Sequence, residues 1–266
     1  MKKSSVNKSS LKNNQLYSYE APDELLNERV ILITGAGGAI GGAAAISYAK
    51  HGATVILLGR SEKTLNDTYD AIVNAGYSKP MLCPLDLENA TPGNYQALVE
   101  SIEKEFGRLD GILHAAAMLG SLTPLEHYDL SLWSRIMQIN LNAPFLLTRA
   151  CLPLLKAANN ASVIFSAAEV GLKGEAYWGA YGVAHAAVEN LAEIFADELE
   201  VNTSIRVNSL DPGLVRSRLR ALAYPGEDPN TLVTAIKIMP AYLYLMGDDS
   251  AGITGGRFDA QPHTPS

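Results

Sequence analysis

The chain has 266 residues, of which 47% are hydrophobic and 18% charged, and its formal net charge is −7. The apolar share excludes wholesale disorder, because it is that of an ordinary globular protein with a sizeable core. The negative charge argues against nucleic acid as a main partner. Two cysteines cannot form a disulfide framework, and this scarcity favours a reducing, cytoplasmic setting.

The N-terminal segment differs from the rest of the chain, because it contains several lysines and no acid before Glu20. It lacks an apolar region of the kind found in secretory signals. No segment elsewhere is as long and apolar as the roughly 20-residue stretch that a membrane span needs. We therefore expect residues 1–27 to be a basic, disordered tail and residues 28–266 to form a single domain with no membrane span.

Short apolar runs alternate with longer amphipathic segments from residue 29 onward. The runs are typical of buried parallel strands, which are apolar throughout because both faces of the sheet are covered. Expected strands are 29–34, 54–58, 81–85, 111–115, 162–165 and 205–208. Expected helices are 39–51, 62–74, 91–106, 131–157 and 177–199. This alternation predicts an α/β fold: a doubly wound Rossmann domain with a mostly parallel sheet of about seven strands and helices on both faces.

A glycine-rich loop joins the first expected strand to the first helix and reads TGAGGAIGG from Thr34. Glycines at such a junction let the backbone approach a phosphate, while the helix N-terminus offers free N–H groups and a partial positive charge. A tight turn without a ligand is the alternative interpretation. If a dinucleotide binds, the candidate contacts are Gly35, Gly37, Gly38, Ile40 and Gly41.

This loop resembles that of the short-chain dehydrogenase/reductase family, which reads TGxxxGxG. Thr34, Gly35 and Gly41 match the pattern, whereas Ala39 stands in place of the middle glycine. If that position requires a positive φ, alanine costs about 1–2 kcal/mol. If it only lies close to the cofactor, the methyl group crowds the binding site.

The resemblance extends to residue 260 and implies further cofactor contacts. No acid stands at the end of the second strand, where Arg60 follows instead, and this favours the 2′-phosphate of NADP(H) over NAD(H). A solvated surface arginine is the alternative. The resemblance places Asp86 beside the adenine, Pro212 and Gly213 beside the nicotinamide, and Ser217 on its amide.

The catalytic positions depart from the family pattern. Tyr181 matches the acid/base tyrosine and Asn140 matches the helix asparagine, but His185 replaces the lysine and Ala168 the serine. A neutral histidine does little to lower a tyrosine pKa of about 10. Loss of one oxyanion donor typically costs about 10²–10³ in rate. We therefore expect an oxidoreductase by descent that binds NADP(H) and is catalytically impaired or inactive.

An active NADP(H)-dependent carbonyl reductase or alcohol dehydrogenase is the other hypothesis. In that case Glu169, Tyr181 and His185 would form a different acid/base set; otherwise Glu169 is a solvated loop residue and His185 a packed one. The histidines show no metal-ligand spacing. Family resemblance implies a variable substrate lid at 216–231. It also implies a homodimer or homotetramer formed through the long helices at 131–157 and 177–199.

Overall fold

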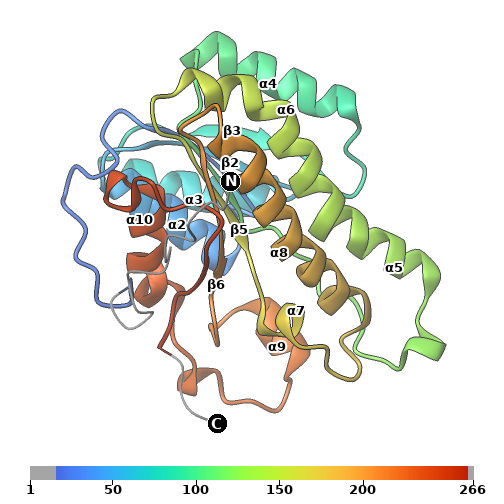
Figure 1. Cartoon of the computed structure of the whole chain (residues 1–266). Coiled ribbons are helices and arrows are strands. Elements are labelled where there is room, and N and C mark those ends of the chain that lie inside the picture. Colours follow the sequence, from blue (N-terminus) through green and yellow to red (C-terminus); the bar gives the residue numbers. More distant parts are fainter. Residues whose placement is uncertain (1–15, 263–266) are drawn as a thin grey trace, which may run out of the picture.

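The computed structural model describes residues 16–262, which contain one seven-stranded sheet with helices on both faces (Figure 1). The strand order is β3-β2-β1-β4-β5-β6-β7, and every neighbouring pair is parallel. The strands are β1 (Val30–Thr34), β2 (Thr54–Gly59), β3 (Met81–Pro84), β4 (Gly111–His114), β5 (Ser162–Ser166), β6 (Arg206–Asp211) and β7 (Arg257–Asp259). The predicted Rossmann architecture is confirmed. The strand order reverses between β1 and β4, where the carboxyl ends of the strands form the usual binding edge of such sheets.

The helices divide into two layers, each packed on its own apolar core. One layer holds α2 (Ala39–Lys50), α3 (Glu62–Asn74) and α10 (Met239–Met246), and the other holds α4 (Pro92–Phe106), α6 (Ala143–Ala157) and α8 (Gly179–Glu200). The shorter helices are α5 (Leu130–Met137), α7 (Glu169–Leu172) and α9 (Arg218–Ala223). Within the described part of the chain, no helix is long and apolar enough to cross a membrane.

The helix expected at 131–157 is interrupted by a π-helical turn, Gln138–Asn142, between α5 and α6. The Ala143 amide there bonds to the Gln138 carbonyl, five residues back. Pro144 has no N–H, so it cannot make the ordinary helical bond to the carbonyl of Asn140, and a wider turn results. Sequence periodicity did not reveal this turn, which presents the Asn140 side chain to the loop after β4.

The expectation of a disordered tail is wrong for residues 16–27. Leu16 and Leu26 are 1% and 0% exposed and belong to the core that also contains α2 and α10. The Tyr19 hydroxyl donates a hydrogen bond to the Asp249 carboxylate at 2.7 Å. These apolar residues are buried against the core, although most residues of the N-terminal segment are polar. Residues 1–15 lie outside the described part of the chain.

Candidate functional site

The glycine loop turns sharply at the end of β1. Gly35 has a φ of +66°, and a Cβ there would lie 2.9 Å from the carbonyl oxygen of Ala115. A Cβ on Gly41 would collide with the Gly35 carbonyl. Packing alone therefore requires glycine at both positions. The sharp turn that they form is compatible with a phosphate ligand.

The N-terminus of α2 is exposed behind this loop. Gly38 occupies the N-cap with no side-chain cap, and the amide of Gly42 donates to its carbonyl at 2.8 Å. The amides from Ala39 to Gly41 therefore precede the first full helical bond and are available to an anion. Ala39 is the first helical residue and has no positive φ, so the backbone penalty considered above does not apply. The methyl group of Ala39 would still crowd a cofactor bound at this loop.

Arg60 and Asp86 follow the next two strands along the same edge of the sheet. Arg60 is exposed directly after β2 and precedes Ser61, the N-cap of α3. The Asp86 carboxylate accepts hydrogen bonds from the amide of Glu88 at 3.2 Å and from the Asn89 side chain at 2.8 Å. The Arg60 side chain is thus exposed and can contact a ligand, whereas the Asp86 carboxylate is already engaged in hydrogen bonds within its own turn.

The loop after β4 is held from two sides. The Thr34 hydroxyl accepts hydrogen bonds from the amides of Ala115 and Ala116, both at 3.1 Å. The Asn140 side chain accepts from the Met118 amide at 2.8 Å and donates to the Met118 carbonyl at 3.0 Å. Sequence reasoning missed this anchoring role of Thr34. The parallel pairing of β1 with β4 brings the two segments together.

Tyr181 and His185 pack against each other on the buried side of α8. Tyr181 is 8% exposed and His185 is 4% exposed. Burial and the nearby Asp211 carboxylate raise the pKa of Tyr181 above its ordinary value. Burial lowers the pKa of His185 to about 4, against a smaller opposing effect of the Ser166 backbone. His185 is therefore neutral at pH 7 and supplies no positive charge to Tyr181.

Helix α7 covers His185 and explains its burial. A Cβ on Gly171 would lie 3.0 Å from the Cβ of His185, so the two helices are in close contact. Neither ring nitrogen of His185, nor the Ser166 hydroxyl, has a side-chain hydrogen-bond partner among the described residues. Ala168 is the N-cap of α7 and Glu169, its first residue, is exposed. The structure thus places His185 beside Tyr181 without connecting Glu169 to either ring by a hydrogen bond.

The segment after β6 forms another wall of the site. The Asp211 carboxylate accepts from the Gly213 amide at 2.8 Å and pairs with Arg257 at 2.9 Å. Gly213 has a φ of +69°, which favours glycine at the turn after Pro212. The Ser217 hydroxyl caps α9, so one of its acceptor sites is already engaged. The effect of Asp211 on Tyr181 was not apparent from the sequence, because it depends on α8 packing against β6.

The segment 216–231, which includes α9, is linked to the tyrosine through aromatic rings. Arg220 pairs with Glu227 through two bonds of 2.6 and 2.7 Å, and its guanidinium lies 3.7 Å from the ring centroid of Tyr224. The Tyr224 and Trp178 centroids are 6.1 Å apart, and those of Trp178 and Tyr181 are 5.6 Å apart. The segment expected to be a lid therefore contacts the wall beside Tyr181.

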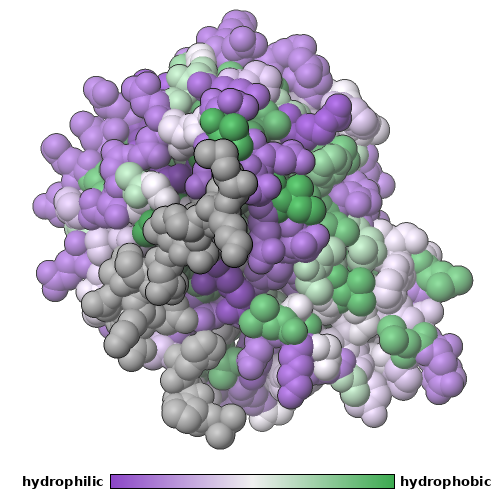
Figure 2. All heavy atoms as spheres, in the orientation of Figure 1, coloured by the Kyte–Doolittle hydropathy of each residue, from purple (hydrophilic) through white to green (hydrophobic). Residues whose placement is uncertain are grey.

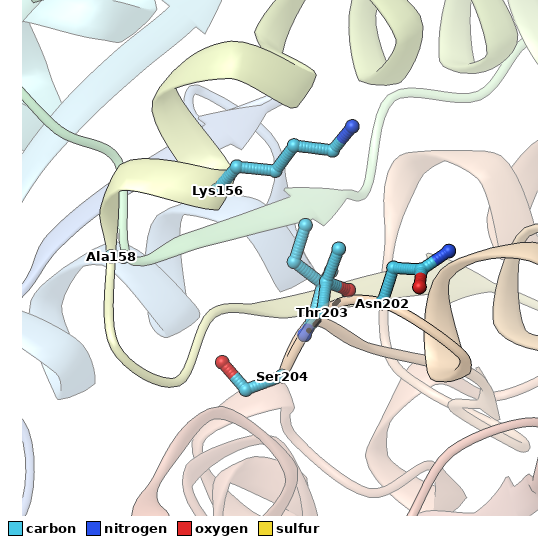
Figure 3. A pocket seen from close by; sticks show the side chains of 6 residues that line it. Lys156, Ala158, Asn202, Thr203 and Ser204 are labelled. Atoms are coloured by element: carbon cyan, nitrogen blue, oxygen red, sulfur yellow. Dashed lines mark hydrogen bonds between the residues drawn. The ribbon is translucent and has the colours of Figure 1, made fainter.

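A surface pocket lies at the opposite edge of the sheet, where α8 ends and β6 begins (Figure 3). It is lined by Lys156, Ala158, Asn202, Thr203, Ser204 and Ile205. None of these residues belongs to the strand ends that carry the candidate site.

A family model described as short chain dehydrogenase matches residues 29–228. The chain belongs to the short chain dehydrogenase family. It is 45% identical to the oxidoreductase YciK of Escherichia coli K12 over 92% of this chain and 96% of that protein. A solved short chain dehydrogenase from Pseudomonas syringae is 51% identical, with a TM-score of 0.90, over 91% and 98% of the two chains. One from Shigella flexneri 2a strain 301, complexed with NADP, is 45% identical with a TM-score of 0.88, over 91% and 100% of the two chains.

The candidate site fits NADP(H) better at its phosphate-binding end, beside α2 and Arg60, than at its catalytic end, beside Tyr181 and His185. The uncapped N-terminus of α2 and the exposed Arg60 suit the phosphate groups of the nucleotide. The family lysine that holds the ribose is absent, and both nitrogens of His185 are enclosed by protein. The residues at the phosphate-binding end are thus compatible with the nucleotide apart from the methyl group of Ala39, whereas the catalytic end has alanine and histidine at the family's serine and lysine positions.

Proposed function

We propose that this short chain dehydrogenase binds NADP(H) and that its turnover is impaired. The observation that carries the proposal is the buried, neutral His185 packed against Tyr181. An acid/base tyrosine needs a nearby cation to bring its pKa toward neutrality. Here burial and Asp211 act in the opposite direction. With alanine at position 168, no serine hydroxyl stabilises the developing oxyanion.

The proposed cofactor contacts follow the predicted residues. When bound, NADP(H) supplies or accepts the hydride. The amides at the N-terminus of α2 would bind the pyrophosphate, and Arg60 would pair with the 2′-phosphate, in preference to NAD(H). Asp86, Pro212, Gly213 and Ser217 would contact the adenine and nicotinamide ends. The NADP complex of the Shigella flexneri relative supports this choice of cofactor.

Two measurements on the wild-type protein test the proposal. We expect fluorescence titration to detect NADPH binding, with weaker NADH binding, while steady-state assays on a panel of carbonyl compounds give turnover far below ordinary enzyme rates. Ordinary turnover that Tyr181→Phe abolishes would establish instead the active reductase with a different acid/base set. Absence of any nucleotide binding would refute the cofactor assignment.

We further propose a homodimer or homotetramer formed through the long helices, in the cytoplasm. Val183 and Ile194 on α8 are 46% and 47% exposed, and Phe145 on α6 is 39% exposed. Figure 2 shows hydrophobic residues interspersed with hydrophilic ones on the surface over α8. Removing such residues from water favours association. Sedimentation equilibrium tests the assembly, and a monomer at all concentrations would contradict it.

A further inference from the structure

A buried ion cluster joins α8, β6 and β7 near the carboxyl ends of the two strands. One guanidinium, that of Arg257, pairs with three carboxylates: Glu189 at 3.1 Å, Asp211 at 2.9 Å and Asp259 at 2.7 Å. The side chains of these acids are each at most 12% exposed. Because three acids share one base, the ionised cluster has a net negative charge, which solvent and salt screen only weakly.

Asp211 brings this charge to the candidate site. Its carboxylate accepts a hydrogen bond from the amide of Gly213, in the turn that the proposed function places beside the nicotinamide. After burial, the Asp211 carboxylate is the cause that raises the pKa of Tyr181, so its field reaches the reacting end. Burial raises the pKa of Asp211 itself, whereas the Gly213 amide and Arg257 favour its ionised form. The exposed carboxylate of Glu169, at the start of α7, adds negative charge from the solvent side (Figure 1).

The cations near this end of the site do not neutralise the cluster. Burial lowers the pKa of His185 to about 4, so this side chain is neutral at pH 7. Lys173, after α7, and Arg218, on α9, are exposed, and solvent and salt screen their charges. Arg216 and Arg220 are hydrogen-bonded to other groups of their own segment. We therefore expect a negative potential at the turn after β6.

The two redox forms of the proposed cofactor differ in charge at one place. The nicotinamide ring is cationic in NADP⁺ and neutral in NADPH, while the phosphates, riboses and adenine are the same. A nearby carboxylate stabilises the cationic ring and has little effect on the neutral one. Comparing the two forms therefore isolates the charge around the ring from every other contact of the nucleotide.

We infer that Asp211 makes the site prefer the oxidised cofactor, so that NADP⁺ binds more tightly than NADPH. The inference rests on the proposed function, because it requires the nicotinamide at the turn after β6. It assigns to Asp211 a role in selecting the redox form, beyond its pairing with Arg257. A tenfold preference would lower the reduction potential of the bound cofactor by about 30 mV.

Calorimetric titration of the full chain with NADP⁺ and with NADPH, at pH 7, tests the preference. The quantity compared is the Kd of NADPH divided by the Kd of NADP⁺. We expect this ratio to be at least about 5 in the wild type, and Asp211→Asn to lower it about fivefold or more. The asparagine oxygen can still accept from the Gly213 amide. A purely structural role of Asp211 would weaken both forms alike and leave the ratio unchanged, which would overturn the inference.

Two variants of the same cluster give opposite or smaller changes. Arg257→Gln removes the positive charge and should raise the ratio. Glu189→Gln is the matched control for Asp211→Asn, because it also replaces a carboxylate that pairs with Arg257. Glu189 accepts from Ser209, two residues before Asp211 on β6, so we expect the ratio to change by about twofold or less. An equal change in Glu189→Gln and Asp211→Asn would contradict the assignment to Asp211, and this comparison stands even if Arg257→Gln does not fold.

The exposed cations and the cofactor proposal are tested separately. Lys173→Ala and Arg218→Ala should each leave the ratio within about twofold of the wild type, because their charges are screened. A larger change than that caused by Asp211→Asn would show that the surface charges decide the preference instead. Binding of NADPH as tightly as NADP⁺ by the wild type would refute the inference alone. Failure of both forms to bind would refute the cofactor proposal and this inference with it.

Discussion

The imidazole of His185 lies against the phenol of Tyr181, with ring centroids 4.3 Å apart and ring planes inclined by 52°. The two residues are one helical turn apart on α8, so the residue type at position 185 decides the electrostatic surroundings of the tyrosine. A neutral ring fills the space and contributes packing. It provides neither the positive charge nor the ribose contact of a lysine.

Restoring the missing groups should restore catalysis. We expect Ala168→Ser combined with His185→Lys to raise kcat/KM for NADPH-dependent ketone reduction by about 10²-fold or more, because an oxyanion donor and a cation return to the site. Steady-state kinetics checks this, with Tyr181→Phe in the double variant as the control that removes the gain. A folded double variant that binds NADPH but stays inert would show that other defects limit turnover.

The buried His185 should make the protein sensitive to acid. Its pKa is about 4 in the folded protein and near 6.5 when unfolded, so the unfolded state takes up the proton first and stability falls as the pH drops from 6.5 toward 4. Between pH 7 and pH 5 this residue accounts for about 2 kcal/mol of lost stability.

Urea unfolding of His185→Leu at the two pH values tests this expectation. The variant should lose about 2 kcal/mol less than the wild type on acidification. His127→Leu is the control, because it removes an imidazole whose side chain is exposed rather than buried. An unchanged pH dependence in His185→Leu would mean that its imidazole is accessible to solvent or protonated in the native state.

Selectivity for the nucleotide should depend on Arg60. Replacement by alanine would remove the proposed charge-assisted contact with the 2′-phosphate, and we expect NADPH to bind about 10- to 100-fold more weakly. NADH binding should not change, since it has no phosphate there. Fluorescence titration with both nucleotides measures the difference, and Arg218→Ala controls for general loss of surface charge. Parallel weakening of NADPH and NADH would argue against a specific 2′-phosphate contact.

The turn after β1 should tolerate no side chain. Gly35→Ala combines a positive φ with contacts at 2.9 Å to the backbone of residues 115 and 116, and we expect a loss of about 3 kcal/mol. Gly76→Ala is the matched control, because Gly76 has a φ of +80° but nothing within 4 Å of the added Cβ, so about 1 kcal/mol should be lost. Thermal or urea unfolding measures both. Equal losses would show that the loop after β4 moves aside.

The local pattern of residues was enough to predict most of the architecture. The six strands expected from apolar runs all form, and the helices at 62–74 and 91–106 end at the predicted positions. The loop motif, Tyr181, and the replacements at Ala168 and His185 were equally visible, because the family motifs occur at fixed spacings. Those features depend on neighbouring residues along one strand or helix, which a sequence displays directly.

Contacts between distant segments could not be predicted in this way. The sequence did not show that residues 16–27 pack on the core, that Pro144 widens the turn holding Asn140, or that Ala39 has an ordinary helical φ. Nor did it reveal that α7 encloses His185 and that Asp211 lies close enough to Tyr181 to raise its pKa. Burial and electrostatic coupling depend on which elements meet in space. The positions of the candidate catalytic residues could therefore be read from the sequence, whereas their protonation states are set by the packing of the folded chain.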